Sequence, residues 1–266
     1  TAALAALLIP MMRAAGYDVN RSAGLVAAGG IIAPVIPPSI GFIIFGVSGN
    51  VSITKLFLAG IVPGVMMGVA IGIAWWWVAK KENVQPAPNM PMKERLKVTA
   101  NSTFAVALPL IIIGGMKAGV FTPTEAAVAA AVYSFVVGAF VYRELKLSEV
   151  YGLFLAAGKT TAVVMFLVAA AMVSAWLITV ANIPSEVAAM LSPFMGNKTL
   201  LMFVMMVLIV IVGTALDFAP TVLILTPVLM PVVLKAGIDP VYFGVLFIMN
   251  NAIGLITPPV GTVLNV

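Results

Sequence analysis

The sequence predicts an all-α, polytopic membrane protein built from inverted-topology repeats, and two observations lead to this fold class. First, 62% of the 266 residues are hydrophobic and 9% are charged, and the apolar runs are long enough to cross a bilayer. Second, one pattern occurs twice, because Pro231 follows Pro10 by 221 residues and each proline opens the same series of landmarks. The landmarks are Pro10, Ala15, Gly16, Asp18, Pro37 and Pro38 in the first copy, and Pro231, Ala236, Gly237, Asp239, Pro258 and Pro259 in the second.

The composition excludes several functional classes. The chain has no cysteine and no histidine, so disulfides, Cys- or His-ligated metals and His-based catalysis are excluded. An intramembrane aspartyl protease needs two facing aspartates, but only Asp217 is predicted at membrane depth. We therefore expect no enzyme. The net charge of +5 is expected to report membrane orientation and not nucleic-acid binding.

The first half of the chain predicts two crossings between two shorter helices. A half-length helix is expected over 1–15, and a crossing over 22–47 is broken at Pro37-Pro38. The next crossing, 56–79, ends in Trp75-Trp76-Trp77 and two lysines, which is typical of an interfacial anchor. The polar stretch 82–101 predicts a short helix at the membrane surface.

The second half predicts three more crossings and a second broken segment. Crossings over 104–116 and 126–142 are joined by Thr122-Pro123-Thr124-Glu125, which predicts a capping box, with a functional Glu125 as the alternative. The segment 147–159 is expected at the interface and 161–180 as a crossing. Two half-length arms, 200–212 and 221–234, flank 213–220 and predict a re-entrant hairpin. The segment 241–256 then leads into the second Pro-Pro.

The distribution of basic residues predicts the orientation. Ten Lys and Arg fall on the side of the first Gly-x-Asp loop and four on the other, which places the first side in the cytoplasm. Five crossings separate the two Gly-x-Asp loops, with the hairpin contributing none. Because five is odd, the two copies are expected to be inverted in the membrane.

The broken segments predict a cation site. Irregular backbone at membrane depth must be buried in protein or line a wet cavity, and freed carbonyls with a hydroxyl suit a dehydrated Na⁺. A plain proline kink is the alternative for each break. The predicted Na⁺ ligands are Gly213, Thr214, Gly254, Thr257 and Val260 in the second repeat, and Ala33, Ile36, Pro38 and Ser39 in a partial first site.

Polar residues near the breaks are candidate substrate contacts. The half-helix that follows each Pro-Pro points its positive end at the midplane, which suits an anionic substrate. Candidate substrate-binding residues are Ser39, Asp217, Asn250 and Asn251. For Asp217 a turn cap is nearly as well supported, and for the two asparagines interhelical hydrogen bonds are equally well supported.

Four motifs in order resemble the large membrane subunit of TRAP (tripartite ATP-independent periplasmic) transporters. They are the stretch from Thr1 through Pro10-Met11-Met12 to Gly16-Tyr17, then Ile36-Pro37-Pro38-Ser39-Ile40, Phe121-Thr122-Pro123-Thr124-Glu125-Ala126, and Gly237-Ile238-Asp239-Pro240 with Ile256-Thr257-Pro258-Pro259-Val260-Gly261. The resemblance implies a multi-pass protein of the bacterial inner membrane that imports an organic anion by Na⁺ symport, using an elevator-type transport domain. It also implies a small TRAP membrane subunit and a periplasmic substrate-binding protein as partners.

The resemblance also suggests a domain organisation. Residues 1–50 form part of the first repeat of the transport domain, namely the return arm of hairpin 1 and a broken helix. Residues 51–182 supply scaffold and connecting helices with the interfacial segment 82–101, although some of these helices can belong to the transport domain. Residues 183–266 form the second repeat. The first hairpin tip and the last helix are expected outside this chain.

The substrate expected first is sialic acid or a related sugar acid. The stretches Gly29-Gly30-Ile31-Ile32-Ala33-Pro34 and Phe42-Ile43-Ile44-Phe45-Gly46 are more similar to sugar-acid members than to C4-dicarboxylate members. A C4-dicarboxylate transporter of the same family and a passive anion channel remain as alternatives.

Overall fold

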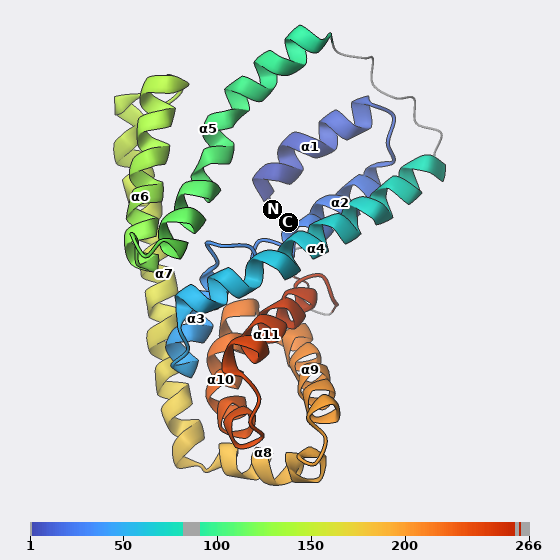
Figure 1. Cartoon of the computed structure of the whole chain (residues 1–266), viewed down its shortest axis with the longest axis vertical. Helices are drawn as coiled ribbons and strands as arrows, with labels where there is room; N and C mark the ends of the chain where they lie inside the picture. Colours follow the sequence, from blue (N-terminus) through green and yellow to red (C-terminus); the bar gives the residue numbers. More distant parts are fainter. Residues whose placement is uncertain (1, 82–90, 259–260, 262–266) are drawn as a thin grey trace. The chain divides into compact units, whose positions relative to one another are not determined.

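The computed structural model describes residues 2–81, 91–258 and 261, and the chain divides into two compact units (Figure 1). The first, here called the broken-helix unit, comprises Thr1–Ala87 and Ala171–Val266. The second, the linking unit, comprises Pro88–Ala170. The described residues contain helices and no strands, which confirms the predicted all-α class.

Most helices belong to the broken-helix unit. Its N-terminal part contains α1 (Ala2–Ala14), α2 (Val19–Gly30), α3 (Ile40–Gly49) and α4 (Ile53–Lys81). Its C-terminal part contains α8 (Ile183–Leu191), the 3₁₀ turn η2 (Ser192–Phe194), α9 (Lys198–Ala215), α10 (Phe218–Lys235) and α11 (Pro240–Gly254). The helix α7 (Leu147–Val180) begins in the linking unit and ends in this one.

The first break confirms the interruption expected at Pro37-Pro38 but is longer than the sequence predicted. Helix α2 ends at Gly30, and residues 31–39 are irregular until Ser39 caps α3. Pro34, like Pro37 and Pro38, has no N–H to donate, and each proline disfavours helix in the residue before it. The paired glycines before Ile31 are weak helix formers, so the helix ends well before the Pro-Pro.

The second break lies at the corresponding place in the other copy. Helix α11 ends at Gly254, and three turn hydrogen bonds carry the chain to Thr257. They run from the N–H groups of Leu255, Ile256 and Thr257 to the carbonyls of Ala252, Ile253 and Gly254, at 3.1–3.2 Å. Pro259 lies outside the described residues.

The loops that open the two copies have the same local geometry. Gly16 and Gly237 both adopt positive φ, at 90° and 63°, which side chains other than glycine rarely tolerate. The aspartate two residues later then caps the next helix in each copy. Asp18 Oδ1 accepts from the Arg21 N–H at 2.9 Å, and Asp239 Oδ1 accepts from the Tyr242 N–H at 2.8 Å.

Contacts among the helices show that the two copies run in opposite directions. Along α4, Gly60 lies against Phe42 and Gly68 against Ile32, so α2 and α3 together run antiparallel to α4. Helix α3 is in turn antiparallel to α11, because Gly244 faces Phe45 whereas Ile248 faces Gly41. Helix α11 therefore starts beside the end of α3, at the opposite end of α4 from the first Gly-x-Asp loop. This arrangement is that of inverted repeats.

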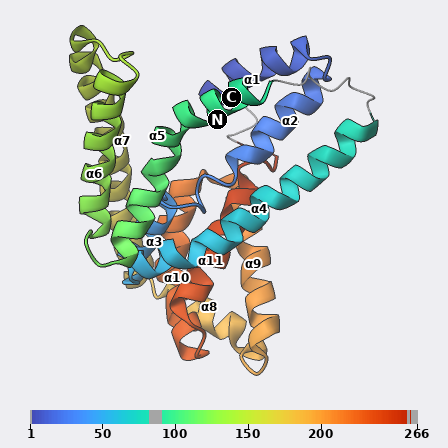
Figure 2. The same ribbon diagram turned by 45° about the horizontal axis from the view of Figure 1, so that its top comes forward.

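Helix α4 packs on both copies through small residues. Figures 1 and 2 show it beside α2, and it also contacts α3 and α11. A Cβ added at Gly60 would lie 2.7 Å from the Val35 carbonyl oxygen, and one at Gly64 would overlap the Ile36 side chain. Glycine at these positions lets the α4 backbone approach the first break closely.

The linking unit differs from the sequence prediction in two places. Helix α5 (Met92–Lys117) includes the polar stretch and the following crossing, with a 43° bend between Met92–Ala100 and Ser102–Lys117. The polar residues 92–100 therefore do not form a separate helix, and residues 82–90 lie outside the described part. The segments 147–159 and 161–180 belong to one continuous 34-residue helix, α7, and the interfacial position of 147–159 stays a prediction. The sequence of α7 contains no proline, and the glycines at positions 152 and 158 do not interrupt the helix.

The capping box in the linking unit is confirmed. The Thr122 N–H donates to Glu125 Oε2 at 2.8 Å, and the Glu125 N–H donates to Thr122 Oγ1 at 3.3 Å. This box starts α6 (Pro123–Val136), which continues through the π-helical turn η1 (Val137–Val141). The Tyr133 hydroxyl donates to the Phe104 carbonyl at 2.8 Å and ties α6 to α5.

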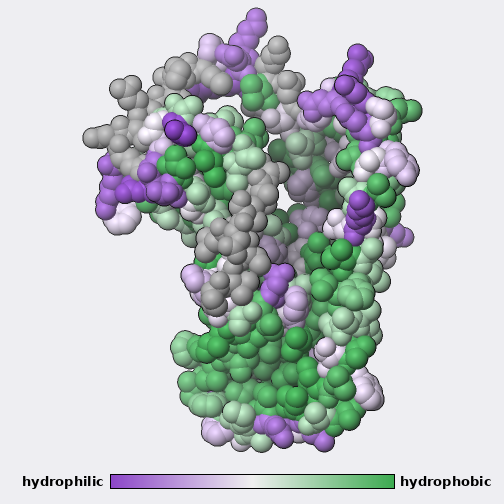
Figure 3. All heavy atoms as spheres, turned by 180° about the vertical axis from the view of Figure 1, so that it is seen from behind, coloured by the Kyte–Doolittle hydropathy of each residue, from purple (hydrophilic) through white to green (hydrophobic). Residues whose placement is uncertain are grey.

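Five described helices are long and apolar enough to cross a membrane, or six if the bent α5 is one span. The surface seen in Figure 3 accordingly has a broad hydrophobic field bordered by hydrophilic side chains. The hairpin arms α9 and α10 have 18 residues each and are longer than the predicted half-length arms. At the hairpin base, Lys198 Nζ donates to the Gly237 carbonyl at 2.9 Å, while the tip reaches only as far as the end of α11.

We predict that Gly60→Ala destabilises the broken-helix unit. The added methyl would lie against the Val35 carbonyl, and such overpacking costs about 1–3 kcal/mol. Thermal unfolding in detergent, followed by tryptophan fluorescence, should give a lower Tm. The matched control is Gly72→Ala on the same helix, where a Cβ meets nothing within 4 Å. An equal Tm for the two variants would contradict the close approach of α4 to the break.

Candidate cation and substrate site

The tip of the hairpin meets the end of α11 backbone to backbone. A Cβ added at Gly254 would lie 2.7 Å from the Gly213 carbonyl oxygen, and one at Gly213 would lie 2.9 Å from Asn251 Oδ1. Only glycine permits both approaches. Two predicted Na⁺ ligands, from segments 41 residues apart in sequence, are thus brought together.

Asn251 lies beside these glycines with one acceptor unused. Its side chain is 1% exposed, and its Nδ2 donates to the Phe218 carbonyl at 3.0 Å. Its Oδ1 is the one buried side-chain polar atom without a hydrogen-bond partner among the described residues. A buried unpaired acceptor is costly, so this oxygen is suited to a ligand.

Two helix C-termini meet at this point. Helix α9 ends at Ala215 and α11 at Gly254, and the final carbonyls of a helix lack partners within it and carry partial negative charge. Together with Asn251 Oδ1 they provide neutral oxygen donors, which suit a hard monovalent cation. The described residues contain no group of three or more His, Cys, Asp or Glu that could hold a metal. The donors present therefore fit Na⁺ better than a divalent transition metal.

The two predicted hydroxyl ligands, Thr214 and Thr257, each donate one hydrogen bond and keep lone pairs that can coordinate a cation. Thr214 Oγ1 donates to the Ile211 carbonyl and Thr257 Oγ1 to the Ile253 carbonyl, both at 2.7 Å. A hydroxyl has one proton and two lone pairs, so each oxygen can still coordinate a cation. Val260, the fifth predicted ligand, lies outside the described residues.

Two helix N-termini meet on the other side of the hairpin tip. A Cβ added at Gly41, in the first turn of α3, would lie 2.7 Å from Phe218 Cζ, in the first turn of α10. Ser39 Oγ and Asp217 Oδ1 each accept one N–H at these ends, and the remaining N–H groups of the two first turns carry partial positive charge, which suits an anion. Phe218 also accepts the Asn251 hydrogen bond through its carbonyl, so one residue links the end of α11 to the first turn of α3.

The predicted Na⁺ ligands of the first repeat differ in their solvent exposure. Ala33, Ile36 and Pro38 are exposed in the break, whereas Ser39 is 1% exposed. Ser39 Oγ donates to the Pro34 carbonyl and accepts from the Phe42 N–H at 3.2 Å. Ser39 therefore links the irregular segment to the first turn of α3 and caps that helix. The sequence analysis did not assign this structural role to it.

Two of the polar candidates for substrate also have structural partners. Asp217 caps α10 through a 2.8 Å hydrogen bond from the Phe218 N–H, and its side chain is exposed at the hairpin tip. Asn250 Nδ2 donates to the Met206 carbonyl at 2.5 Å and ties α11 to α9. A substrate contact for Ser39, Asp217, Asn250 or Asn251 stays a prediction. The position of Asn251 at the glycine contact associates it with the cation side, which residue type alone did not indicate.

An all-α membrane protein with inverted repeats, two broken helices and converging helix ends has the architecture of a secondary transporter. The chain belongs to the tripartite ATP-independent periplasmic transporter family, DctM component, whose family model matches residues 1–266. This confirms the resemblance to TRAP large permeases and places the protein in the bacterial inner membrane. The relatives are transporter permeases and not enzymes, in agreement with the sequence analysis.

Three curated relatives illustrate the similarity. The 2,3-diketo-L-gulonate TRAP transporter large permease of Escherichia coli strain K12 is 57% identical over the whole chain and 63% of its own length. The C4-dicarboxylate permease of Pseudomonas aeruginosa is 36% identical, over 98% of this chain and 61% of its own length. The sialic acid permease of Vibrio cholerae is 36% identical, over 99% of this chain and 62% of its own length. The chain thus spans less than two thirds of each of these relatives.

We predict that Gly254→Ala disrupts the contact between the hairpin tip and α11. Its methyl would lie 2.7 Å from the Gly213 carbonyl oxygen, which is backbone and cannot rotate away, so the tip must shift. We expect a lower Tm in detergent and faster proteolysis at the tip. Gly24→Ala, where a Cβ meets nothing within 4 Å, should leave both measurements unchanged. A wild-type response from Gly254→Ala would rule out the tight backbone contact.

Proposed function

We propose that this chain forms part of a Na⁺-driven importer of organic acids. The observation that carries the proposal is the pairing of helix ends at the hairpin tip. The C-termini of α9 and α11 meet at Gly213 and Gly254, with the buried acceptor of Asn251 between them, and favour a cation. The N-termini of α3 and α10 meet at Gly41 and Phe218 and favour an anion.

Na⁺ is the proposed coupling ion because the donors are neutral oxygens. Proposed ligands in the second repeat are the five residues expected from the sequence, joined by Asn251. In the first repeat, the exposed break residues Ala33, Ile36 and Pro38 are better placed to offer carbonyls than Ser39 is to offer its hydroxyl. When bound, the ion would neutralise the partial negative charge at the helix C-termini.

The proposed substrate is a sugar acid of the keto-aldonate kind. The relative named for 2,3-diketo-L-gulonate is 57% identical, whereas those named for sialic acid and for C4-dicarboxylates are each 36% identical. The comparison thus gives sialic acid no advantage over C4-dicarboxylates. It favours the sugar-acid class that the sequence suggested, and a diketo-sugar acid is the substrate that we propose first.

Two protein partners are proposed from the family. The family name denotes a three-part system that includes a periplasmic component. We infer that a periplasmic substrate-binding protein delivers the anion and that a small membrane subunit accompanies this permease. The isethionate permease of Oleidesulfovibrio alaskensis carries both DctM and DctQ in its name, which agrees with close association of two membrane parts in that relative.

An elevator motion is the proposed mechanism. Exposing one backbone polar group to an apolar medium costs on the order of 2–7 kcal/mol, so moving an assembled site is easier than dismantling it. The sequence analysis placed 56–79 among the scaffold and connecting helices, some of which could belong to the transport domain. Because α4 packs against the first break through Gly60 and Gly64, we propose instead that α4 moves with the broken helices.

We predict that Thr257→Val weakens Na⁺ activation of uptake. Losing one hydroxyl ligand should raise the Na⁺ concentration for half-maximal uptake on the order of tenfold. The measurement is substrate accumulation in proteoliposomes that contain the full-length permease, its small subunit and the binding protein. Thr199→Val, a hydroxyl loss at the N-terminus of α9, should leave the Na⁺ dependence unchanged.

Two results would contradict the proposed coupling. Equal accumulation in choline buffer and in a Na⁺ gradient would exclude Na⁺ symport. Uptake that only equilibrates the anion, without accumulation against a gradient, would instead indicate a passive channel.

We predict that the distance between residues 32 and 68 stays constant during transport. A Cβ at Gly68 lies 3.8 Å from Ile32 Cδ1, and the chain has no native cysteine to compete with labels at these positions. Spin labels on Ile32→Cys and Gly68→Cys should report one distance with and without Na⁺ and substrate. Labels on Gly68→Cys and Gly152→Cys, across the two units, should report a change. A change in the first pair and constancy in the second would show that α4 is static.

A further inference from the structure

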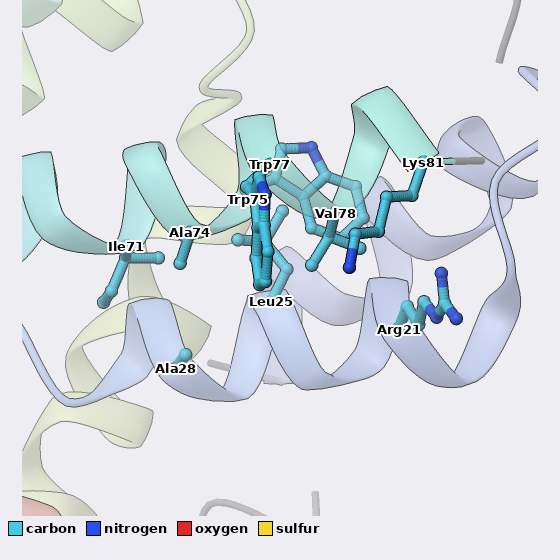
Figure 4. A pocket seen from close by; sticks show the side chains of 9 residues that line it. All are labelled: Arg21, Leu25, Ala28, Ile71, Ala74, Trp75, Trp77, Val78 and Lys81. Carbon is cyan, nitrogen blue, oxygen red and sulfur yellow. The ribbon is translucent and has the colours of Figure 1, made fainter. Parts of the chain in front are cut away.

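A groove of about 460 Å³ lies between α2 and α4, away from the breaks (Figure 4). The helices are antiparallel there, so Arg21 faces Lys81 at one end of the groove and Ala28 lies near Ile71 at the other. Figure 4 shows both cationic side chains at this end of the groove, with the Lys81 side chain folded back toward Trp77. None of these residues belongs to the candidate transport site.

The groove changes from cationic to apolar over the length of one lipid leaflet. Ten residues separate Ile71 from Lys81, which is a rise of ~15 Å along a helix. The hydrocarbon core of a bilayer is ~30 Å thick, so this length corresponds to half of it. Between the ends lie Leu25 and Ala74, and alanine at positions 28 and 74 leaves room beside the larger side chains.

Aromatic residues hold the cationic end in place. Lys81 Nζ lies 4.0 Å from the centroid of the Trp77 ring, and the Trp75 ring lies 5.4 Å from that of Tyr17. Tryptophan and tyrosine in such positions mark the level of lipid headgroups.

We propose that this groove binds an anionic phospholipid of the cytoplasmic leaflet. Its phosphate lies between Arg21 and Lys81, and one acyl chain lies along Leu25, Ala28, Ile71 and Ala74. The basic residues predict that this end of α4 faces the cytoplasm, where anionic headgroups are attracted to Lys and Arg. A zwitterionic lipid offers the same chain, but its ammonium group meets two like charges. Free phosphate lacks the acyl chain that the apolar part of the groove receives.

The test is native mass spectrometry of the intact permease with phosphatidylglycerol and phosphatidylcholine of identical chains. We expect phosphatidylglycerol to bind more tightly on the order of tenfold, because two basic side chains contribute. The double variant Arg21→Gln/Lys81→Gln should lose this preference and keep weak binding of both lipids. Ala74→Leu, which fills the apolar part, should weaken both lipids. Lys117→Gln/Lys235→Gln, a matched loss of two positive charges outside the groove, should retain the preference.

Three results would overturn the proposal. They are equal binding of the two lipids to the wild type, an unchanged preference in the Arg21→Gln/Lys81→Gln variant, and displacement of phosphatidylglycerol by inorganic phosphate alone. Residual phosphatidylcholine binding and an unchanged Tm in the double variant establish that it is folded. Loss of preference in that variant then reports the loss of the headgroup contacts.

Discussion

The broken-helix unit is organised by the need to satisfy backbone polar groups where two helices are interrupted. Lipid cannot hydrogen-bond a free carbonyl or N–H, so irregular backbone at membrane depth must find partners inside the protein. At the first break Ser39 bonds the Pro34 carbonyl and the Phe42 N–H. At the second, the Asn251 side chain donates to the Phe218 carbonyl at the hairpin tip. The hairpin is thus the partner that the end of α11 requires.

Close backbone contacts bring the hairpin tip and α4 to the two breaks. Glycines at 213 and 254 let the tip meet α11, and glycines at 60 and 64 let α4 lie against the first break. Adding a methyl group at either contact would separate backbone from backbone. The same contacts make α4, the breaks and the hairpin one packed body, since close-packed protein interiors do not deform continuously. A site supported in this way is suited to motion as a unit.

The sequence predicted the repeat, both breaks, the hairpin and the capping box, because each depends on local features such as Pro-Pro, Gly-x-Asp and Thr-x-x-Glu. It did not predict that the first break begins at Ile31, since that depends on Gly29-Gly30, Pro34 and the packing of α4 acting together. It treated 147–159 and 161–180 as two segments, whereas α7 is continuous because no proline interrupts it. The orphaned acceptor of Asn251 depends on the tertiary contact between α9 and α11, for which neighbouring sequence carries no signal.

The convergence of helix ends gives the proposed coupling a physical basis. A cation beside the C-termini of α9 and α11 and an anion beside the N-termini of α3 and α10 would lie on two sides of one hairpin tip. In a medium of low dielectric the two ions would attract each other across the tip, where the Asp217 carboxylate that caps α10 adds a further negative charge. If the cation strengthens binding of the anion in this way, the anion must strengthen binding of the cation by the same factor, as thermodynamic linkage requires.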